Sequence, residues 1–214
     1  MITTNELIKK VRCLINEAEE DVEISVLTDK KRSFNDIIKE LLPQAVSLVQ
    51  QHKGPKGGFV NVKCLTSLTG LIVDNGNGGG TMNLPADFVE MVFCRLTTWK
   101  RPCVTLYPAR SPQADRQYNE AIRSGDLKPV CIEGVSTSGS RCIEFYPYTA
   151  GTKVKEFFYE AVFDIDEGLN RSDKSMADAV AYFCVSLLYN MFERYDAAKS
   201  FMSFAISLCN TSGK

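Results

Sequence analysis

The stretch Leu84–Pro108, LPADFVEMVFCRLTTWKRPCVTLYP, decides how the rest of the chain is expected to fold. Prolines divide it: Pro85 opens a turn, Pro102 interrupts the run, and Pro108 ends it. Between the first two lies an apolar run long enough to cross a hydrophobic core once, made of Phe88, Val89, Met91, Val92, Phe93, Cys94 and Leu96. This pattern predicts a central, buried element.

The segments before this stretch have the period of helices. Residues 4–19 place apolar side chains on one face, with Thr4 or Asn5 as the expected N-cap. Residues 33–51 carry a broad apolar stripe, and Pro43 within it predicts a kink or a break. An acidic run after the first helix predicts a solvated helix end, with the inner surface of an assembly as the alternative; it contains Glu17, Glu19, Glu20, Asp21 and Glu23.

The middle of the chain shifts toward the period of two that is typical of strands. Strands are expected over 59–65, 71–73, 129–135, 141–146 and 153–163, with a hairpin loop at 136–140. A short helix is expected to begin at Ser111 or Pro112 and to end near Gly125. Asn75–Gly80 lacks the glycine orders of phosphate-binding loops, so it predicts a flexible hairpin or partner-contacting loop.

The chain ends in a predicted helical hairpin. Ser172 or Asp173 is the expected cap, and the apolar pattern restarts around Tyr195 with Phe204 on its apolar face. The fold class is therefore α+β: N-terminal helices and a C-terminal helical hairpin, with a small antiparallel β-sheet inserted between them. We expect one domain over 1–214, with a helical core at 1–53 and 172–210 and a β-rich insertion at 59–163.

Composition excludes several classes of protein. Lys and Arg total 25 against 26 Asp and Glu, whereas a dedicated nucleic-acid binder is strongly basic. None of the eight cysteines has the spacing of a zinc or thioredoxin motif, and the N-terminus has no signal peptide, so reduced thiols in a cytoplasm are expected. No apolar run approaches the roughly 20 residues of a membrane span.

Few residues suggest catalysis. His52 is the only histidine and ends a helix, and no G-x-S-x-G motif is present. Asp164, Asp166 and Glu167 lack the ligand spacing of a calcium loop. The sequence therefore predicts no catalytic residue, cofactor or metal. A small cytoplasmic hydrolase that uses a cysteine with His52 is the alternative.

The group Trp99-Lys100-Arg101 has two interpretations. The tryptophan anchors a core and its neighbouring cations extend outward. In the alternative, the tryptophan stacks on a base, as in a nucleic-acid-binding accessory protein.

The order of motifs resembles a known family. LPADF is followed by an apolar strand, a Trp-Lys-Arg-Pro group, a Lys128-Pro129-Val130 strand, a hairpin over Gly139–Tyr146 and a helical hairpin. This order is similar to that of head–tail connector (adaptor or ring) proteins of tailed bacteriophages, in particular the ring proteins of crAss-like phages. The resemblance covers nearly the whole chain as an order of elements, and its specific wording lies within 84–102 and 128–146.

The resemblance implies a structural virion protein and no enzyme. Copies of the chain would form a ring that joins the portal protein to the tail or to other ring proteins and continues the DNA channel. DNA would pass without sequence-specific binding, and assembly would take place in the bacterial host cytoplasm, without a membrane. The candidate partner-contact residues are Trp99, Lys100 and Arg101, together with Asn75, Gly76 and Asn77 of the glycine-rich loop.

Overall fold

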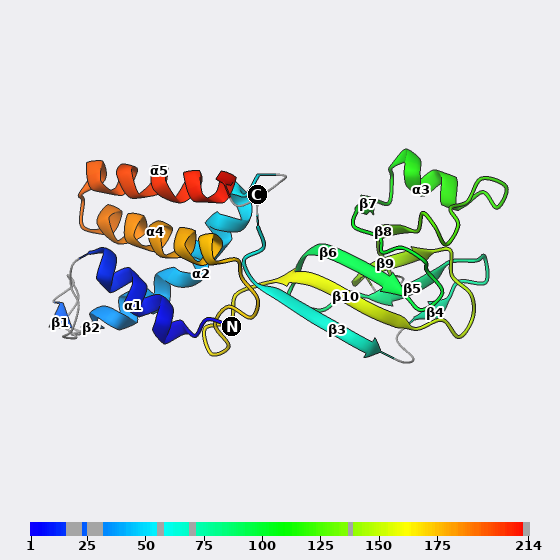
Figure 1. Ribbon diagram of the computed structural model, residues 1–214, viewed down its shortest axis with the longest axis horizontal. Helices are drawn as coiled ribbons and strands as arrows, with labels where there is room; N and C mark the ends of the chain where they lie inside the picture. Colours follow the sequence, from blue (N-terminus) through cyan, green and yellow to red (C-terminus); the bar gives the residue numbers. More distant parts are fainter. Residues whose placement is uncertain (16–22, 25–31, 55–57, 69–71, 137–138, 212–214) are drawn as a thin grey trace. The chain divides into compact units, whose positions relative to one another are not determined.

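The chain folds into two compact units in a computed structural model that describes residues 1–15, 23–24, 32–54, 58–68, 72–136 and 139–211. The helical unit comprises Met1–Val62 and Val162–Lys214, and the β unit comprises Lys63–Ala161 (Figure 1). The class is α+β, as predicted: helices come first, sheets occupy the middle of the chain, and the last two helices pack together. The expectation of a single connector-like domain stays a prediction.

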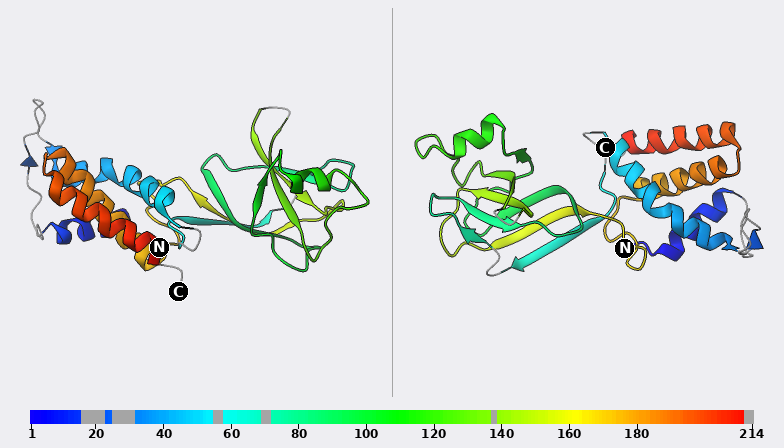
Figure 2. Two further views of the ribbon diagram at one scale, coloured as in Figure 1. Left: turned by 90° about the horizontal axis from the view of Figure 1, so that it is seen from above. Right: turned by 180° about the vertical axis from the view of Figure 1, so that it is seen from behind.

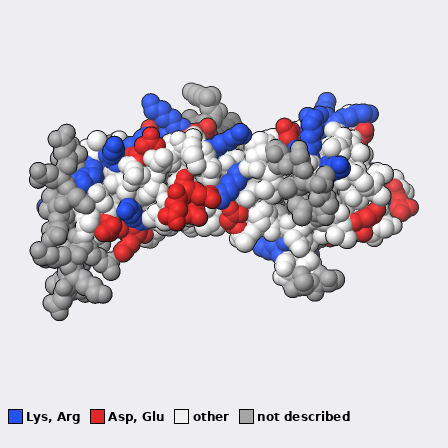
Figure 3. Space-filling model, turned by 90° about the horizontal axis from the view of Figure 1, so that it is seen from below, with Lys and Arg blue, Asp and Glu red and all other residues white. Residues whose placement is uncertain are grey.

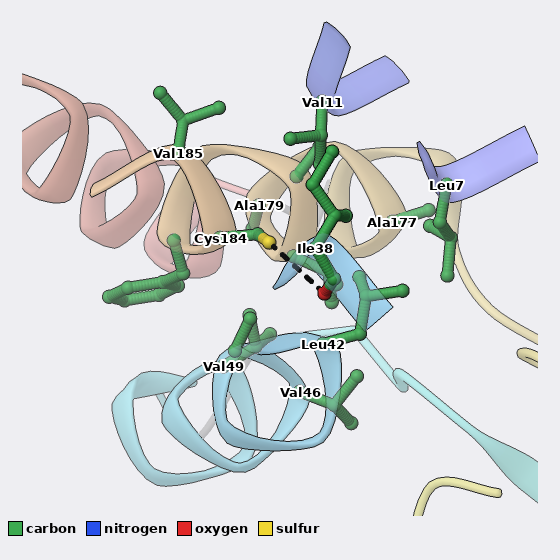
Figure 4. Packing of buried hydrophobic residues seen from close by; sticks show 14 of the residues in the cluster. Leu7, Val11, Ile38, Leu42, Val46, Val49, Ala177, Ala179, Cys184 and Val185 are labelled. Atoms are coloured by element: carbon green, nitrogen blue, oxygen red, sulfur yellow. Dashed lines mark hydrogen bonds between the residues drawn. The ribbon is translucent and has the colours of Figure 1, made fainter. Parts of the chain in front are cut away.

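Among its described residues, the helical unit contains four helices, α1 (Thr4–Leu14), α2 (Phe34–His52), α4 (Lys174–Met191) and α5 (Tyr195–Thr211), with a pair of two-residue strands, β1 (Glu23–Ile24) and β2 (Arg32–Ser33). α4 packs against each of the other three helices and lies beside α5 in an antiparallel hairpin (Figure 2). Alanines on α4, at 177, 179 and 181, are buried and let the neighbouring helices approach closely. Figure 4 shows this core, where side chains of α1, α2 and α4 interlock.

The helix starts differ slightly from prediction. The N-cap of α1 is Thr3, one residue before the predicted Thr4 or Asn5. Thr3 and Glu6 form a reciprocal capping box, and the hydrogen bonds from Thr3 to the Glu6 carboxylate lower the pKa of that carboxyl. α2 begins next to Ser33, close to the predicted start, and Ser33 is its N-cap. Asp173, one of the two expected caps, occupies the N-cap position of α4 without a side-chain cap hydrogen bond. The predicted continuation of the first helix, and the acidic residues 17–21, lie outside the described residues.

Pro43 does not break α2, which is continuous from Phe34 to His52. The proline ring is exposed, while Leu42, Ala45 and Val46 on either side are buried. The backbone hydrogen bond that the proline removes is therefore on the solvent side of the helix. Core packing of the opposite face keeps the helix intact across the proline.

The β unit contains two sheets where the sequence predicted one. A three-stranded sheet has the order β3 (Val62–Leu68), β10 (Val154–Ala161), β6 (Phe88–Leu96). A five-stranded sheet has the order β4 (Val73–Asp74), β5 (Gly80–Asn83), β9 (Arg141–Tyr146), β8 (Val130–Val135), β7 (Leu106–Pro108). The pairs β6–β10, β4–β5, β5–β9 and β8–β9 are antiparallel, and the pair β7–β8 is parallel.

The Leu84–Pro108 stretch is less central than predicted. β6 is an edge of its sheet, and β10 is the middle strand. One face of β6 does enter the core of the β unit, with Phe88, Met91, Cys94 and Leu96 buried, while Val89 and Glu90 are exposed. The helix α3 (Pro112–Gln117) begins at the Ser111 cap as predicted, but ends well before Gly125.

The core of the β unit lies between its two sheets and is rich in aromatic and sulfur-containing side chains. It contains Met82, Phe88, Met91, Cys94, Leu96, Trp99, Cys103, Cys131, Ile143, Phe145, Tyr148, Val154, Phe157, Tyr159 and Ala161. Each unit thus has a separate hydrophobic core, because none of these residues belongs to the cluster in the helical unit.

Candidate partner-contact surfaces

Trp99 is a core residue, which is the first of the two interpretations of its sequence group. Its side chain is only 3% exposed, and its ring makes an edge contact with Phe145 at a centroid distance of 6.1 Å. The indole Nε1 donates a hydrogen bond of 2.8 Å to the backbone oxygen of Pro147. Lys100 and Arg101 are exposed, so a partner that binds here would contact these two cations and not the indole.

The glycine-rich segment is a hydrogen-bonded turn between β4 and β5. Asn75 N donates to Gly79 O at 2.9 Å, and the side chains of Asp74 and Asn77 accept from the backbone N–H groups of Gly76 and Gly79. The structure therefore gives the turn internal support that the prediction of a flexible loop did not include. Asn75, Gly76 and Asn77 are exposed at its tip.

The structure attaches the two groups of candidate residues to the same connecting segment. Trp99 bonds to the oxygen of Pro147, and the backbone N–H of the next residue, Tyr148, donates to Gly78 O at 2.9 Å. Both segments are thus fixed to the connection between β9 and β10. Residues 75–77 and 100–101 form two exposed rims beside that connection.

The rim at Lys100 carries positive charge that is partly balanced. Lys100 Nζ lies 3.1 Å from Asp126 Oδ2. The exposed Lys153 is joined to the same region through Thr97, whose backbone N–H donates to Lys153 O and whose hydroxyl accepts from Lys153 N. In the view of Figure 3, Lys and Arg atoms gather along one edge of the β unit with a few acidic atoms between them. On the helical unit the two signs of charge intermix.

The turn between α4 and α5 exposes large apolar side chains, including Met191, which the helical periodicity of the sequence predicted to face the core. Met191 is 43% exposed, Phe192 40% and Tyr195 58%, within five consecutive residues. Phe204, expected on the apolar face of α5, is 61% exposed. The sequence did contain a signal for this exposure, namely a group of large apolar residues at the end of α4. At the end of a helix such residues extend beyond the part of the helix that packs on the core. We call Met191, Phe192 and Tyr195 the α4–α5 turn patch.

Two cavities open among the described residues. One, of about 470 Å³, lies between α1 and α4 and is lined by Lys9, Lys10, Cys13, Leu14, Asp178, Ala181 and Tyr182; an ion pair joins Lys10 to Asp178 there. The other, of about 460 Å³, lies beside β5 and the β8–β9 hairpin and includes Glu144, which accepts a hydrogen bond of 2.9 Å from the Tyr146 hydroxyl. The second cavity is also lined by Cys142, and burial, followed by the charge of Glu144, raises the pKa of its thiol.

The residues weighed for catalysis occupy structural positions. The His52 ring stacks on Phe183 at a centroid distance of 5.6 Å, and among the described residues no hydrogen bond joins it to a cysteine. Asp164 closes a turn: its backbone oxygen accepts from Gly168 N and its carboxylate accepts from Asp166 N, both at 2.9 Å. Within the described part of the chain, no group of three His, Cys, Asp or Glu side chains is arranged to hold a metal ion.

No protein-family model matches the sequence, and no curated protein matches it either. None of the described helices is both long and apolar enough to cross a membrane.

Proposed function

We propose that this protein is a structural subunit of a bacteriophage virion, one of several copies that form a ring between the portal and the tail. The ring would continue the channel through which DNA passes. The proposal combines the resemblance of the motif order to connector proteins with surfaces that are suited to association.

The observation that carries the proposal is the α4–α5 turn patch. Contiguous exposed apolar patches on a folded protein mark surfaces that bind other proteins, membranes or ligands. Met191, Phe192 and Tyr195 lie at the end of a well-packed helical hairpin, so their exposure is not a consequence of a poorly formed core. A neighbouring subunit or the portal would cover them.

A closed ring needs a second, different surface on each copy, because subunits related by rotation contact one another head to tail. The rims at 75–77 and 100–101 of the β unit are candidates for it. They are exposed, they carry amide and cationic groups, and hydrogen bonds hold them in place before any partner arrives. A preorganised contact loses less entropy on binding.

The charge balance is compatible with a channel wall. A net charge of -1 gives no strong, uniform attraction to phosphates. DNA can therefore move past such a surface without being held. The nucleic-acid-binding alternative gains nothing from the structure, since the indole of Trp99 is buried and presents no face for a base to stack on.

The test is the state of assembly of the full-length protein, alone and mixed with the portal protein of the same virus. We expect closed rings, either alone or only on the portal, in native mass spectrometry and negative-stain electron microscopy. A chain that stays monomeric in both settings contradicts the proposal.

The α4–α5 turn patch is tested by a double variant, Phe192→Ser with Tyr195→Ser. Because both side chains are largely exposed, the variant should fold with an unchanged circular dichroism spectrum and assemble at least tenfold more weakly, about 1.4 kcal/mol. Lys199→Ser, at an exposed polar position on α5, is the matched control and should assemble like the original chain. Equal assembly of both variants would remove the patch from the interface.

A further inference from the structure

Three cysteines from separate segments meet in the core of the β unit. Cys94 is on β6, Cys103 follows it in the segment that leads to β7, and Cys131 is on β8. Cys94 and Cys103 face each other across an antiparallel bridge whose two backbone hydrogen bonds are both 2.8 Å. The Cys131 thiol belongs to the same buried cluster and is close enough to the other two thiols to interact with both of them electrostatically. All three are free cysteines.

We expect Cys103 to react first, since it is the one of these three cysteines with any exposed surface. Hydrogen bonding from the Cys131 thiol lowers the pKa of the Cys103 thiol to about 7; burial opposes the shift, and backbone hydrogen bonds at Thr105 and Cys131 add to it. When protonated, the thiol donates to the Thr105 backbone oxygen at 3.3 Å. Burial, followed by hydrogen bonds to Cys103 and Cys94, instead raises the pKa of Cys131. Since the thiolate is the nucleophile, reaction begins at Cys103.

A small oxidant can approach Cys103. Cys103 is 5% exposed, and its neighbours Pro102 and Val104 are exposed, so this segment of the chain lies at the surface of the β unit. Hydrogen peroxide is little larger than water. Cys94 and Cys131 have no exposed surface, so they lie deeper in the core.

The geometry also selects the second thiol. Directly opposite Cβ atoms of an antiparallel pair are about 4.5–5.5 Å apart, and hydrogen-bonded pairs have the longer separations, whereas a disulfide needs roughly 3.5–4.5 Å. Cys94 and Cys103 are such a pair, so their disulfide would require the strands to move. Cys131 is on β8, opposite Leu106 of the parallel neighbour β7, and both its thiol and its backbone interact with the Cys103 thiol, so it is the better partner.

We propose that Cys103 and Cys131 form an oxidation site, at which a peroxide converts the Cys103 thiolate to a sulfenic acid and the Cys131 thiol then closes a disulfide. In the first step the O–O bond breaks, one oxygen joins the Cys103 sulfur, and the departing hydroxide takes a proton to become water. In the second step the S–S bond forms and the S–OH bond breaks, which releases a second water. Two thiols are oxidised and one peroxide is reduced.

The consequence is a covalent link between the segment after the edge strand β6 and the interior strand β8. The chain is expected to be made with reduced thiols, and the link would form only when peroxide reaches the folded protein. Because the disulfide restricts the conformations of the unfolded chain, it should raise the midpoint of thermal unfolding of the β unit. The inference does not depend on ring assembly.

The experiment exposes the full-length chain to hydrogen peroxide, alkylates the remaining thiols, and maps the peptides by mass spectrometry. Cys13→Ser is the background, because Cys13 is exposed and would link separate molecules. We expect a peptide pair joined through Cys103 and Cys131, with a mass loss of about 2 Da relative to the two thiols. The half-buried Cys64 should react more slowly than Cys103.

Variants separate the two steps. Cys131→Ser should leave a sulfenic acid at Cys103 that dimedone traps, and Cys103→Ser should give no linked peptide. Cys142→Ser, which removes another buried thiol of the β unit, is the matched control and should still form the link. A Cys103 thiol that stays reduced while Cys64 is oxidised, or a disulfide in any other pairing, overturns the proposal. The mapping of the Cys13→Ser chain decides this even if a variant fails to fold.

Discussion

Gly79 shows at the scale of one residue why the glycine-rich turn has its composition. A methyl group at Gly79 would lie 2.6 Å from the Tyr146 ring, closer than nonbonded carbons approach. Tyr146 cannot move aside, since it is fully buried and its hydroxyl is hydrogen-bonded to Glu144 at 2.9 Å. The glycine therefore serves close packing in addition to the flexibility that the sequence suggests.

Replacing Gly79 by alanine should lower the free energy of unfolding by about 1–3 kcal/mol, the usual cost of overpacking a core. Urea unfolding followed by tryptophan fluorescence measures the change. Gly125→Ala is the control, because nothing lies within 4 Å of a methyl group there and its φ is not positive. Equal effects of the two substitutions would show that the Tyr146 ring yields.

Cys184 gives the helical unit a dependence on pH. Burial raises the pKa of its thiol to about 12, and its sulfur lies 4.0 Å from the Ile38 backbone oxygen (Figure 4). An unfolded cysteine titrates near pH 8.5. Between these two values only the unfolded chain releases the proton, so the stability present below about pH 8.5 is lost as pH rises.

We expect the free energy of unfolding to fall between pH 8.5 and 11 by up to about 1.4 kcal/mol per pH unit from this one group. Urea unfolding under reducing conditions, compared with Cys184→Ala, measures that contribution. The variant should start less stable and lose less stability on the alkaline side. Parallel curves for the two proteins would count against the assignment.

At the scale of an element, α2 shows how packing overrides a local rule. A proline inside a helix removes one hydrogen bond and costs about 3 kcal/mol relative to alanine. α2 tolerates this because Pro43 is on its exposed face while the residues around it contribute to the core. The local cost remains, although the helix does not break.

Pro43→Ala should therefore stabilise the helical unit by about 1–3 kcal/mol, since the new N–H can donate within the helix. Thermal unfolding followed by far-ultraviolet circular dichroism measures it. Gln44→Ala, at the next exposed position, should change stability by less than about 0.5 kcal/mol. A destabilising effect of Pro43→Ala would mean that the proline is needed for the path of the helix.

At the scale of the whole molecule, the two separate cores predict two separable responses to mutation. Leu42 is buried only in the helical core and Ile143 only in the core of the β unit. The single tryptophan, Trp99, is in the β unit, so its fluorescence reports that unit, while the helices dominate the far-ultraviolet circular dichroism.

Leu42→Ala should shift mainly the circular dichroism transition, and Ile143→Ala mainly the fluorescence transition, each by about 2–5 kcal/mol. Urea unfolding with both signals on the same samples makes the comparison. Transitions that shift together in both variants would show that the units unfold as one.

The amino-acid sequence alone determined the class and order of elements. Helical periodicity placed α1, α2, α4 and α5, and alternation placed β8, β9 and β10 within a few residues, because burial of one face leaves a repeat in the chain. The candidate rims at 75–77 and 100–101 were likewise visible as glycine and cationic groups.

Tertiary structure decided what depends on neighbours that are distant in the chain. It divided the strands between two sheets, made β6 an edge, buried Trp99 against Phe145 and brought three cysteines together. It also left Met191 and Phe204 exposed, although their spacing fits a core face. Pairing and burial are properties of contacts between segments, and a periodic pattern identifies the apolar face of a segment without identifying what covers it.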